Sequence, residues 1–500
     1  MSNQPVPDPN APVAQPLRVR VRMYRSGLGD CFLISFFQAG SKHHVLIDCG
    51  VYQSTPDAAA TMQAIARHIR KTTRRLDLVV ATHEHTDHLS GFQQAQDTFD
   101  QIAMQQIWLA WTEDPVNPLA TKLRQERSLA LNTLRAAVQL MPAEQDYQSQ
   151  TVRGLLNFFG EPINVSTGVS LAASFAASSS GSTARQALDY LASRSDATVA
   201  YCQPGEPPRF LPGLPGVRFF VLGPPTSEAL LKKTLPGKKA QEGYGLSDPV
   251  SLINSFLTAI QQSQGSLFAG SGNRQDLPFD PQYQVSHDHA SLDPFFIEHY
   301  GFGDGVEQGV AWRRIDRDWL GVTSELALQL DQATNNTSLV LAIELVESGQ
   351  VLLFPGDAQV GNWLSWTDLS WDLPGPDGAT QTIHGGDLIA RTVFYKVGHH
   401  GSHNATLREK GLELMQSSQL VAMLPVQRAM AERQKWSMPF PQLYQRLQEK
   451  TRGRLLRLDD GLPAAPLLAE NGLPLLTQAE WKAFQHKTSV QPLYIDYTLE

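Results

Sequence analysis

The alternation of apolar and polar residues predicts strands at the start of the chain. Residues 17–25 (LRVRVRMYR) alternate strictly, which is the period of a strand with one buried face. Two apolar runs, 31–37 and 43–50, follow and are separated by glycine-containing turns. Residues 56–75 place a proline near the start and basic residues in the last turn, which favours a helix. The apolar run 76–82 then predicts a buried strand.

The pattern of apolar and polar residues changes in the middle of the chain. We interpret this change as two insertions at about 112–215 and 226–333. The pattern there predicts an amphipathic helix over 119–141, a small-residue loop over 170–186, a helix over 248–262 and a loop over 283–294. Between the two insertions, residues 216–225 again resemble a strand.

Strand patterns dominate the remainder of the chain. They predict strands over 337–345, 350–357, 388–398, 420–426 and 453–459, with helices over 406–416 and 439–450. The strands therefore fall into two groups with helices between and outside them. This order is typical of an α/β domain, here residues 17–500, that is interrupted by the two insertions.

Composition narrows the class of protein. Hydrophobic residues make up 42% of the 500 residues and charged residues 18%, which indicates a globular protein with a large core. No apolar run approaches the roughly 18 to 20 residues of a membrane span. Residues 1–16 lack the basic and apolar segments of a signal peptide, and their proline and polar content predicts a disordered tail.

The number of cysteines indicates the cellular compartment, and the net charge indicates whether the protein attracts nucleic acid. Only Cys31, Cys49 and Cys202 occur, which argues against a disulfide framework and favours the cytoplasm. The net charge of −8 gives no overall attraction to nucleic acid, although a local basic groove remains compatible with it.

The segment HEHTDH places four possible metal ligands at the end of a predicted strand. His83 and His85 point the same way in an extended chain, so both can bind one ion. Asp87 and His88 follow where the chain must turn, and they can face a second ion. The alternative is a polar loop in which the histidines coincide by chance, but four ligand-type residues in six positions favour a metal site.

This segment resembles the signature of the metallo-β-lactamase superfamily, which implies a four-layer αββα sandwich with a dinuclear metal site. Further blocks resemble, in the same order, the soluble hydrolase domain of ComEC-type competence proteins. These blocks are GLGD (27–30), LIDCG (46–50), NNTSLVLAIE (335–344), LLFPGD (352–357), KVGHHGS (396–402) and RGRLLRLDDG (452–461).

The resemblance implies a role for each matching residue. His83 and His85 would bind the first metal ion, and Asp357 would bridge both ions. Asp87, His88 and one histidine of the pair His399 and His400 would bind the second ion. We favour His399, because it is the first of the pair after the predicted strand.

One expected ligand, a third histidine at the first metal, has no counterpart in the chain. Asn336 and Ser338 stand in the matching region, so water or a weaker oxygen ligand would complete that site. Fewer nitrogen ligands favour Mn²⁺ as an alternative to Zn²⁺. His287 and His289 repeat the H-x-H spacing inside an insertion; a solvated loop is the simpler interpretation, although they are the best candidates for a missing ligand.

Other polar residues would support the site. Asp30 and Asp48 lie at strand ends, where carboxylates orient histidines that bind metals. Lys396, Ser402 and His403 are candidates to contact a phosphate or to protonate the leaving oxygen; for Lys396 and His403, ordinary surface roles are alternatives.

Basic stretches that could bind nucleic acid are few. Residues 70–75 carry one, and Lys232, Lys233, Lys238 and Lys239 form another. A solvated helix end and a solvated loop are the simpler interpretations of the two stretches.

We therefore expect a bacterial, cytoplasmic hydrolase in which a hydroxide between two divalent ions attacks the substrate. A phosphodiesterase or nuclease is the preferred function because the closest blocks resemble the DNA-uptake branch. A hydrolase of small esters, lactones or thioesters is the alternative on the same fold. A non-catalytic module that recruits protein partners through the insertions is the third possibility. The membrane segments of ComEC-type proteins have no counterpart, so the resemblance does not imply DNA transport.

Overall fold

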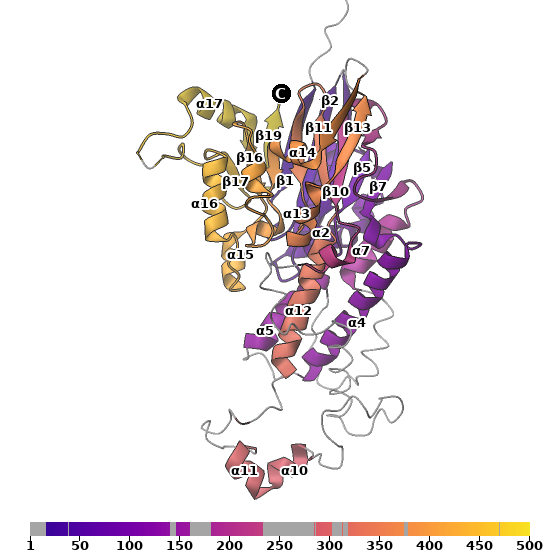
Figure 1. Ribbon diagram of the computed structural model, residues 1–500, viewed down its shortest axis with the longest axis vertical. Helices are drawn as coiled ribbons and strands as arrows, with labels where there is room; N and C mark the ends of the chain where they lie inside the picture. Colours follow the sequence, from indigo (N-terminus) through magenta and orange to yellow (C-terminus); the bar gives the residue numbers. More distant parts are fainter. Residues whose placement is uncertain are drawn as a thin grey trace, which may run out of the picture. The chain divides into compact units, whose positions relative to one another are not determined.

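The computed structural model describes residues 17–38, 40–140, 147–160, 182–233, 285, 287–302, 313, 319–374, 379–469 and 471–500. The chain divides into two compact units (Figure 1). The first unit comprises Met1–Asp114, Thr183–Leu235 and Ala333–Glu500, and the second comprises Pro115–Ser182 and Pro236–Gln332. The predicted tail over 1–16 and the predicted helix over 248–262 lie outside the described residues, as do Lys238 and Lys239.

An eight-stranded sheet forms one half of the first unit. Its strands, in spatial order, are β18 (Thr488–Val490), β19 (Tyr494–Leu499), β1 (Arg18–Tyr24), β2 (Cys31–Gln38), β3 (Ser41–Cys49), β5 (Leu78–Ala81), β7 (Gln106–Ala110) and β8 (Thr198–Cys202). The strands from β18 to β3 pair antiparallel, whereas β3, β5, β7 and β8 are parallel.

A seven-stranded sheet forms the other half. Its order is β17 (Leu455–Arg457), β16 (Val421–Leu424), β15 (Thr392–Lys396), β12 (Gln350–Phe354), β11 (Val340–Leu345), β10 (Leu214–Gly223) and β9 (Arg209–Leu211). The strands from β17 to β12 are parallel and the others antiparallel. Two short pairs complete the strands: β13 (Ser370–Pro374) with β14 (Thr380–His384), and β4 (Arg75–Leu76) with β6 (Ala103–Met104).

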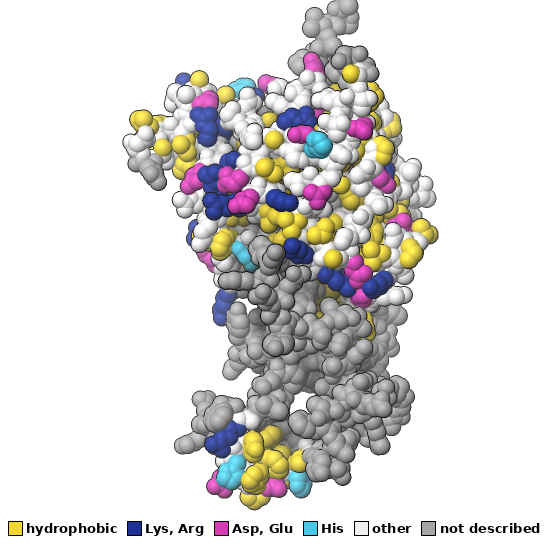
Figure 2. Space-filling view, in the orientation of Figure 1, with side chains coloured by type: hydrophobic (Ala, Val, Ile, Leu, Met, Phe, Trp, Pro, Cys, Tyr) yellow, Lys and Arg dark blue, Asp and Glu magenta, His cyan; other side chains and the backbone are white. Residues whose placement is uncertain are grey.

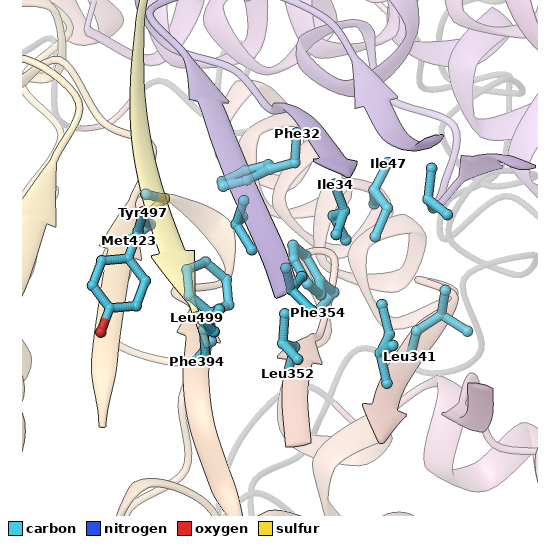
Figure 3. Close-up of a cluster of buried hydrophobic side chains, with 14 of the residues drawn as sticks. Phe32, Ile34, Ile47, Leu341, Leu352, Phe354, Phe394, Met423, Tyr497 and Leu499 are labelled. Atoms are coloured by element: carbon cyan, nitrogen blue, oxygen red, sulfur yellow. The ribbon is translucent and has the colours of Figure 1, made fainter. Parts of the chain in front are cut away.

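The two sheets face each other across a continuous apolar core. Phe32 and Ile34 of β2 lie opposite Leu352 and Phe354 of β12, and all four side chains are buried (Figure 3). Alternate residues of each strand supply this face, as the period of two requires. A second apolar cluster lies on the outer face of the eight-stranded sheet, against helices α1 (Ala58–Thr72), α2 (Thr86–Gln94), α3 (Gln96–Phe99) and α7 (Thr183–Ala192).

Helices also contact the seven-stranded sheet. Helix α13 (Val360–Trp366) contacts β10, and helix α14 (Gly385–Ala390) contacts β11 and β12. The first unit further contains η1 (Trp111–Glu113), α8 (Glu228–Leu231), η7 (His399–Gly401), η8 (Leu412–Leu414), α15 (Arg428–Arg433), α16 (Pro441–Lys450) and α17 (Gln478–Lys487). The predicted αββα sandwich of the metallo-β-lactamase type is confirmed.

The second unit is helical in its described residues. Its helices are α4 (Pro118–Leu140), α5 (Tyr147–Phe159), α10 (His287–Leu292), α11 (Pro294–Tyr300) and most of α12 (Trp319–Asn336), whose last residues belong to the first unit. A separate apolar cluster that includes Leu134, Leu156 and Leu330 joins α4, α5 and α12. The unit therefore has a core of its own.

Several predicted elements differ from the structure. The predicted helix over 406–416 contains only the short η8, because Gly411 adopts φ −143° and ψ −103°, which are not helical angles. The predicted strand over 388–398 begins within helix α14 instead. Short apolar runs such as Leu388–Ile389 fit either element, and the side chain of Asp387 accepts a hydrogen bond from the backbone N–H of His384 and caps the helix.

Two predicted loops contain helices. The predicted loop 170–186 runs into α7, whose buried Ala184, Ala187, Leu188 and Leu191 follow helical spacing that the preceding small residues had obscured. The predicted loop 283–294 contains α10. Strands β7, β8, β18 and β19 were not predicted, and β8 lies inside the span predicted as the first insertion.

Candidate metal centre

The candidate centre lies where parallel strands of both sheets end. The chain leaves β5 at Ala81 and passes through HEHTDH into α2, for which His85 is the N-cap. In the other sheet, Asp357 follows β12, and the histidine pair follows the parallel neighbour β15. Because the carboxyl ends of parallel strands meet at one edge, residues more than 260 positions apart in the sequence come together.

Four buried residues form a group that could hold one divalent ion: Asp87, His88, Asp357 and His400. Each offers a ligand atom, and these atoms all lie within 4.8 Å of one another. His88 Nε2 lies 3.1 Å from an Asp357 oxygen and 3.5 Å from an Asp87 oxygen. His400 Nε2 lies 2.9 Å from the same Asp87 oxygen.

The two histidines of this group are oriented by acceptors behind them. His88 Nδ1 lies 2.7 Å from Asp48 Oδ2, and His400 Nδ1 lies 2.7 Å from the carbonyl oxygen of Pro425. A carboxylate and a carbonyl oxygen are acceptors only, so each histidine donates its hydrogen bond from Nδ1. The Nε2 atom of a neutral histidine then carries the lone pair, and this lone pair points toward the group. When both histidines are neutral, lone pairs of nitrogen and carboxylate oxygen thus face one another, and either a proton or a metal ion between them would remove the repulsion.

Three atoms of this group are buried without a hydrogen-bond partner: His88 Nε2, Asp87 Oδ1 and Asp357 Oδ2. Buried polar atoms are rarely left unpaired, because desolvation costs free energy. Their convergence with His400 Nε2 therefore fits a divalent ion bound by two imidazoles and two carboxylates, a donor set that suits Zn²⁺ or Mn²⁺.

Without a bound ion, protons supply the missing positive charge. Burial opposes the charged form of His88, but Asp357 and the other nearby carboxylates raise its pKa well above the usual range. Burial likewise opposes a charge on His400, and its hydrogen bond to Asp87 raises its pKa. A metal ion would replace these protons, as expected for a ligand site.

His83 and His85 form a separate neutral pair. His83 Nε2 lies 3.1 Å from His85 Nδ1, and burial lowers the pKa of His85 to about 3. Burial also lowers the pKa of His83 well below its usual value. Within the described part of the chain, neither residue joins a group of three histidine, cysteine or carboxylate ligands. The predicted first site therefore has two histidines in place.

His400, rather than the favoured His399, enters the four-residue group. His399 instead pairs with Ser402, whose Oγ lies 2.8 Å from His399 Nδ1, and burial lowers the pKa of His399 to about 4. The reason is the backbone, because His399 and His400 both adopt left-handed conformations, with φ of 42° and 52°. The preference for His399 rested on its place as the first residue after the strand, and two consecutive left-handed residues were not predicted there.

Two predicted supporting residues contact the group. Asp48 accepts hydrogen bonds from the backbone N–H and the hydroxyl of Thr82, each at 2.8 Å, as well as from His88. Ser338 Oγ accepts a 3.0 Å hydrogen bond from the backbone N–H of Asp357. These contacts fix the two elements that supply His88 and Asp357.

Lys396 and Asp30 lie within the centre as an ion pair. The Lys396 ammonium contacts a carboxylate oxygen of Asp30, Oδ1 of Asp357 at 3.0 Å and the carbonyl oxygen of Gly356 at 2.8 Å. Burial opposes its charge, but Asp30 and Asp357 raise the pKa of Lys396 above the usual range. This buried position differs from the predicted contact with a substrate phosphate.

Two other predicted residues, Asn336 and His403, are not members of the group, and His289 belongs to the second unit. Asn336 donates to the carbonyl oxygens of Leu231 and Lys233, and its side-chain oxygen accepts two backbone hydrogen bonds, so its bonding capacity is used for structure. His403 is exposed, with its ring centroid 6.0 Å from that of Phe440. His289, in the second unit, is exposed and lies 3.8 Å from Asp293.

The sequence interpretation missed two residues that support HEHTDH, Thr82 and Arg185. Thr82 holds Asp48, and its position directly before His83 was an available signal. Arg185 contacts Glu84, the residue between His83 and His85, and donates to Glu113 at 2.7 Å. Arg185 lies after a long small-residue stretch, and nothing in its local sequence indicates this role.

The match to a known family covers the first part of this site. Residues 25–122 match the family model of the Metallo-beta-lactamase superfamily. Within this segment the chain is therefore similar to the metallo-β-lactamase superfamily. The matched segment includes Asp30, Asp48 and HEHTDH, and the fold adds Asp357 and His400 from beyond it. No curated protein matches the chain.

Members of this superfamily are mostly metal-dependent hydrolases, and they typically bind divalent metals, commonly zinc. The described part of this chain has a residue group that could hold such an ion. None of the helices within the described residues is both long and apolar enough to cross a membrane.

We predict that Asp48→Asn lowers the affinity for Zn²⁺ about 10- to 100-fold, because the carboxylate that orients His88 is lost. Calorimetric titration of the metal-free protein measures the change. Asp77→Asn is the matched control. Asp77 is also a buried carboxylate beside a histidine, 3.3 Å from His43 Nδ1, but it precedes β5, whereas HEHTDH follows that strand. Equal effects of the two variants would contradict the orienting role.

Proposed function

We propose that this protein is a divalent-metal-dependent phosphodiesterase. The observation that carries the proposal is the convergence of His88, His400, Asp87 and Asp357 on one point, with ligand atoms that lack hydrogen-bond partners. A divalent ion bound there would supply Lewis acidity that activates water and stabilises charge on a phosphoryl oxygen. The resemblance of six sequence blocks to the DNA-uptake branch supports a phosphodiester over a carboxylic ester.

The residues of the chain have distinct tasks in this proposal. Asp87, His88, Asp357 and His400 would hold the ion. Asp48 and the carbonyl of Pro425 keep the Nε2 lone pairs of the two histidines directed at it. The neutral His83 and His85 stand beside the group and would offer two ring nitrogens to a second ion.

The surface charge favours a compact phosphodiester over a long nucleic acid. On the face shown in Figure 2, basic and acidic side chains lie next to each other. Around helix α16, Arg446 pairs with Glu413 and Glu449, and Arg452 pairs with Glu480. Nucleic-acid binding needs positive charges available to phosphates, and these arginines are neutralised by their own neighbours.

We expect hydrolysis of bis(p-nitrophenyl) phosphate that requires added Mn²⁺ or Zn²⁺, because the ion supplies the activation. Chelation should reduce the rate to background, and readdition of the metal should restore it. Linear DNA, RNA, a cyclic dinucleotide, a lactone and a thioester complete the substrate panel. Faster turnover of the lactone or thioester than of every phosphodiester would replace the proposal with the ester-hydrolase alternative. The absence of metal-dependent hydrolysis throughout the panel would overturn it.

A further inference from the structure

We propose that Lys396 is a built-in cation of the metal centre, which limits Asp357 to one coordinating oxygen and weakens binding of a second divalent ion. This inference rests on the proposed function, since it concerns the same metal centre. It assigns to Lys396 a positioning role within the centre and no contact with substrate.

The first observation is the complete engagement of the ammonium group. A lysine ammonium has three hydrogen-bond donors and no acceptor. Lys396 is 1% exposed, and its three neighbours are Asp30, Asp357 Oδ1 and the carbonyl oxygen of Gly356. Three donors thus meet three acceptors, which leaves the ammonium no donor for a substrate.

The second observation concerns the two oxygens of Asp357. Oδ1 accepts from Lys396 at 3.0 Å and from the backbone N–H of His399 at 2.9 Å. Oδ2 has no hydrogen-bond partner and faces His88 Nε2. Oδ1 therefore accepts two hydrogen bonds from the protein, and only Oδ2 is available to bind an ion. Bridging of two ions through separate oxygens of Asp357 would require Lys396 to move.

The third observation is the difference in ligand number between the group around Asp357 and the pair His83 and His85. The group around Asp357 offers four ligand residues, whereas His83 and His85 offer two and join no larger group of ligand residues within the described residues. A second ion would enter a centre that already contains the first ion and the charge of Lys396. Repulsion between cations in a buried site is strong, so the second binding step should be much weaker than the first.

Substitutions at Lys396 and Asp30 distinguish the effect of charge on metal affinity from the effect of side-chain packing. Titration of metal-free protein with Mn²⁺, followed by calorimetry and by electron paramagnetic resonance, gives the stoichiometry and both affinities without any activity assay. In the wild type we expect one tightly bound ion and a second bound about 100-fold more weakly. Lys396→Met should raise the affinity of the second step at least about tenfold, because one positive charge is removed.

Asp30→Asn provides the opposite change. It removes a negative charge and retains the lysine, so both binding steps should weaken. The double variant Lys396→Met with Asp30→Asn preserves the net charge, and its second step should return to within about threefold of the wild type. If Lys396→Met alone does not fold, comparison of the double variant with Asp30→Asn still measures the effect of the lysine, and a tenfold gain in the second step is expected.

The inference is overturned if removal of Lys396 leaves the second affinity unchanged or lowers it in a folded protein. That result would make the lysine a structural residue only. Failure of the wild type to bind even one ion would instead defeat the proposed function. The two failures are therefore distinguishable in the same titration.

Discussion

Replacing Asp87 with alanine should lower kcat/KM for the best phosphodiester substrate by about 10³-fold or more, which corresponds to roughly 4 kcal/mol of transition-state stabilisation. Asp87 stands between His88 and His400, and its Oδ1 has no hydrogen-bond partner in the buried group. Loss of the carboxylate removes one of four ligands and much of the negative charge that attracts the ion. Steady-state kinetics at saturating Mn²⁺ measure the effect.

Asp97→Ala is the matched control for this substitution. Asp97 also lies in the first turn of a helix, α3, but it is exposed and belongs to no metal-binding group found among the described residues. Its removal should change kcat/KM by less than about twofold, since surface substitutions have small effects. Comparable losses in the two variants would mean that the assay reports general damage rather than loss of the metal ligand.

Thermal stability gives a second measure of the Asp87 variant. A ligand present at 100 times its Kd stabilises a protein by about 2.7 kcal/mol, so Mn²⁺ should raise the melting temperature of the wild type. The alanine variant should lose most of this increase. Its metal-free form should melt somewhat lower than the metal-free wild type, because His400 loses its buried hydrogen bond to Asp87, so the comparison is made on the metal-dependent increase alone. A variant that keeps both activity and metal-dependent stabilisation would show that Asp87 is not a ligand.

The parts of this site that could be predicted lie at strand ends. HEHTDH follows an apolar run, and the spacing of its ligand-type residues depends only on local geometry, so their place at the end of a strand could be predicted from the sequence. The assignment of His83 and His85 to one metal ion stays a prediction. The choice between His399 and His400 depends on two consecutive left-handed residues. Such a turn is rare outside glycine, and no propensity scale indicates it.

Longer-range features were harder to predict for a different reason. Lys396 ends a strand, where a solvent-exposed side chain is usual, and only the pairing of the two sheets buries it beside Asp30. Arg185 reaches Glu84 across 101 positions of sequence. Contacts of this kind depend on tertiary structure, which short-range periodicity does not encode.

The backbone of Gly50 packs directly against the first turn of α2, which carries Asp87 and His88. A methyl group on Gly50 would lie 2.3 Å from the carbonyl carbon of Asp87 and 2.4 Å from the backbone nitrogen of His88. Neither atom can turn away as a side chain could. The same region is tied by hydrogen bonds from the backbone N–H of Gly50 to Asp30 O, at 2.9 Å, and from Asp30 N to Asp87 O, at 2.8 Å.

Gly50→Ala should therefore lower the free energy of unfolding by about 3 kcal/mol and weaken Mn²⁺ binding at least about tenfold. The stability loss follows from overpacking against backbone, and the binding loss follows from displacement of Asp87 and His88. Chemical denaturation and calorimetric titration measure the two quantities separately.

Gly386→Ala is the control, because a methyl group there would meet no atom within 4 Å and the residue lies in the first turn of helix α14. Alanine is a better helix former than glycine, so this variant should be as stable as the wild type or up to about 1 kcal/mol more stable. Its Mn²⁺ affinity should not change. If Gly50→Ala behaved like Gly386→Ala in both measurements, backbone packing at Gly50 would not be what holds the metal-binding turn in place.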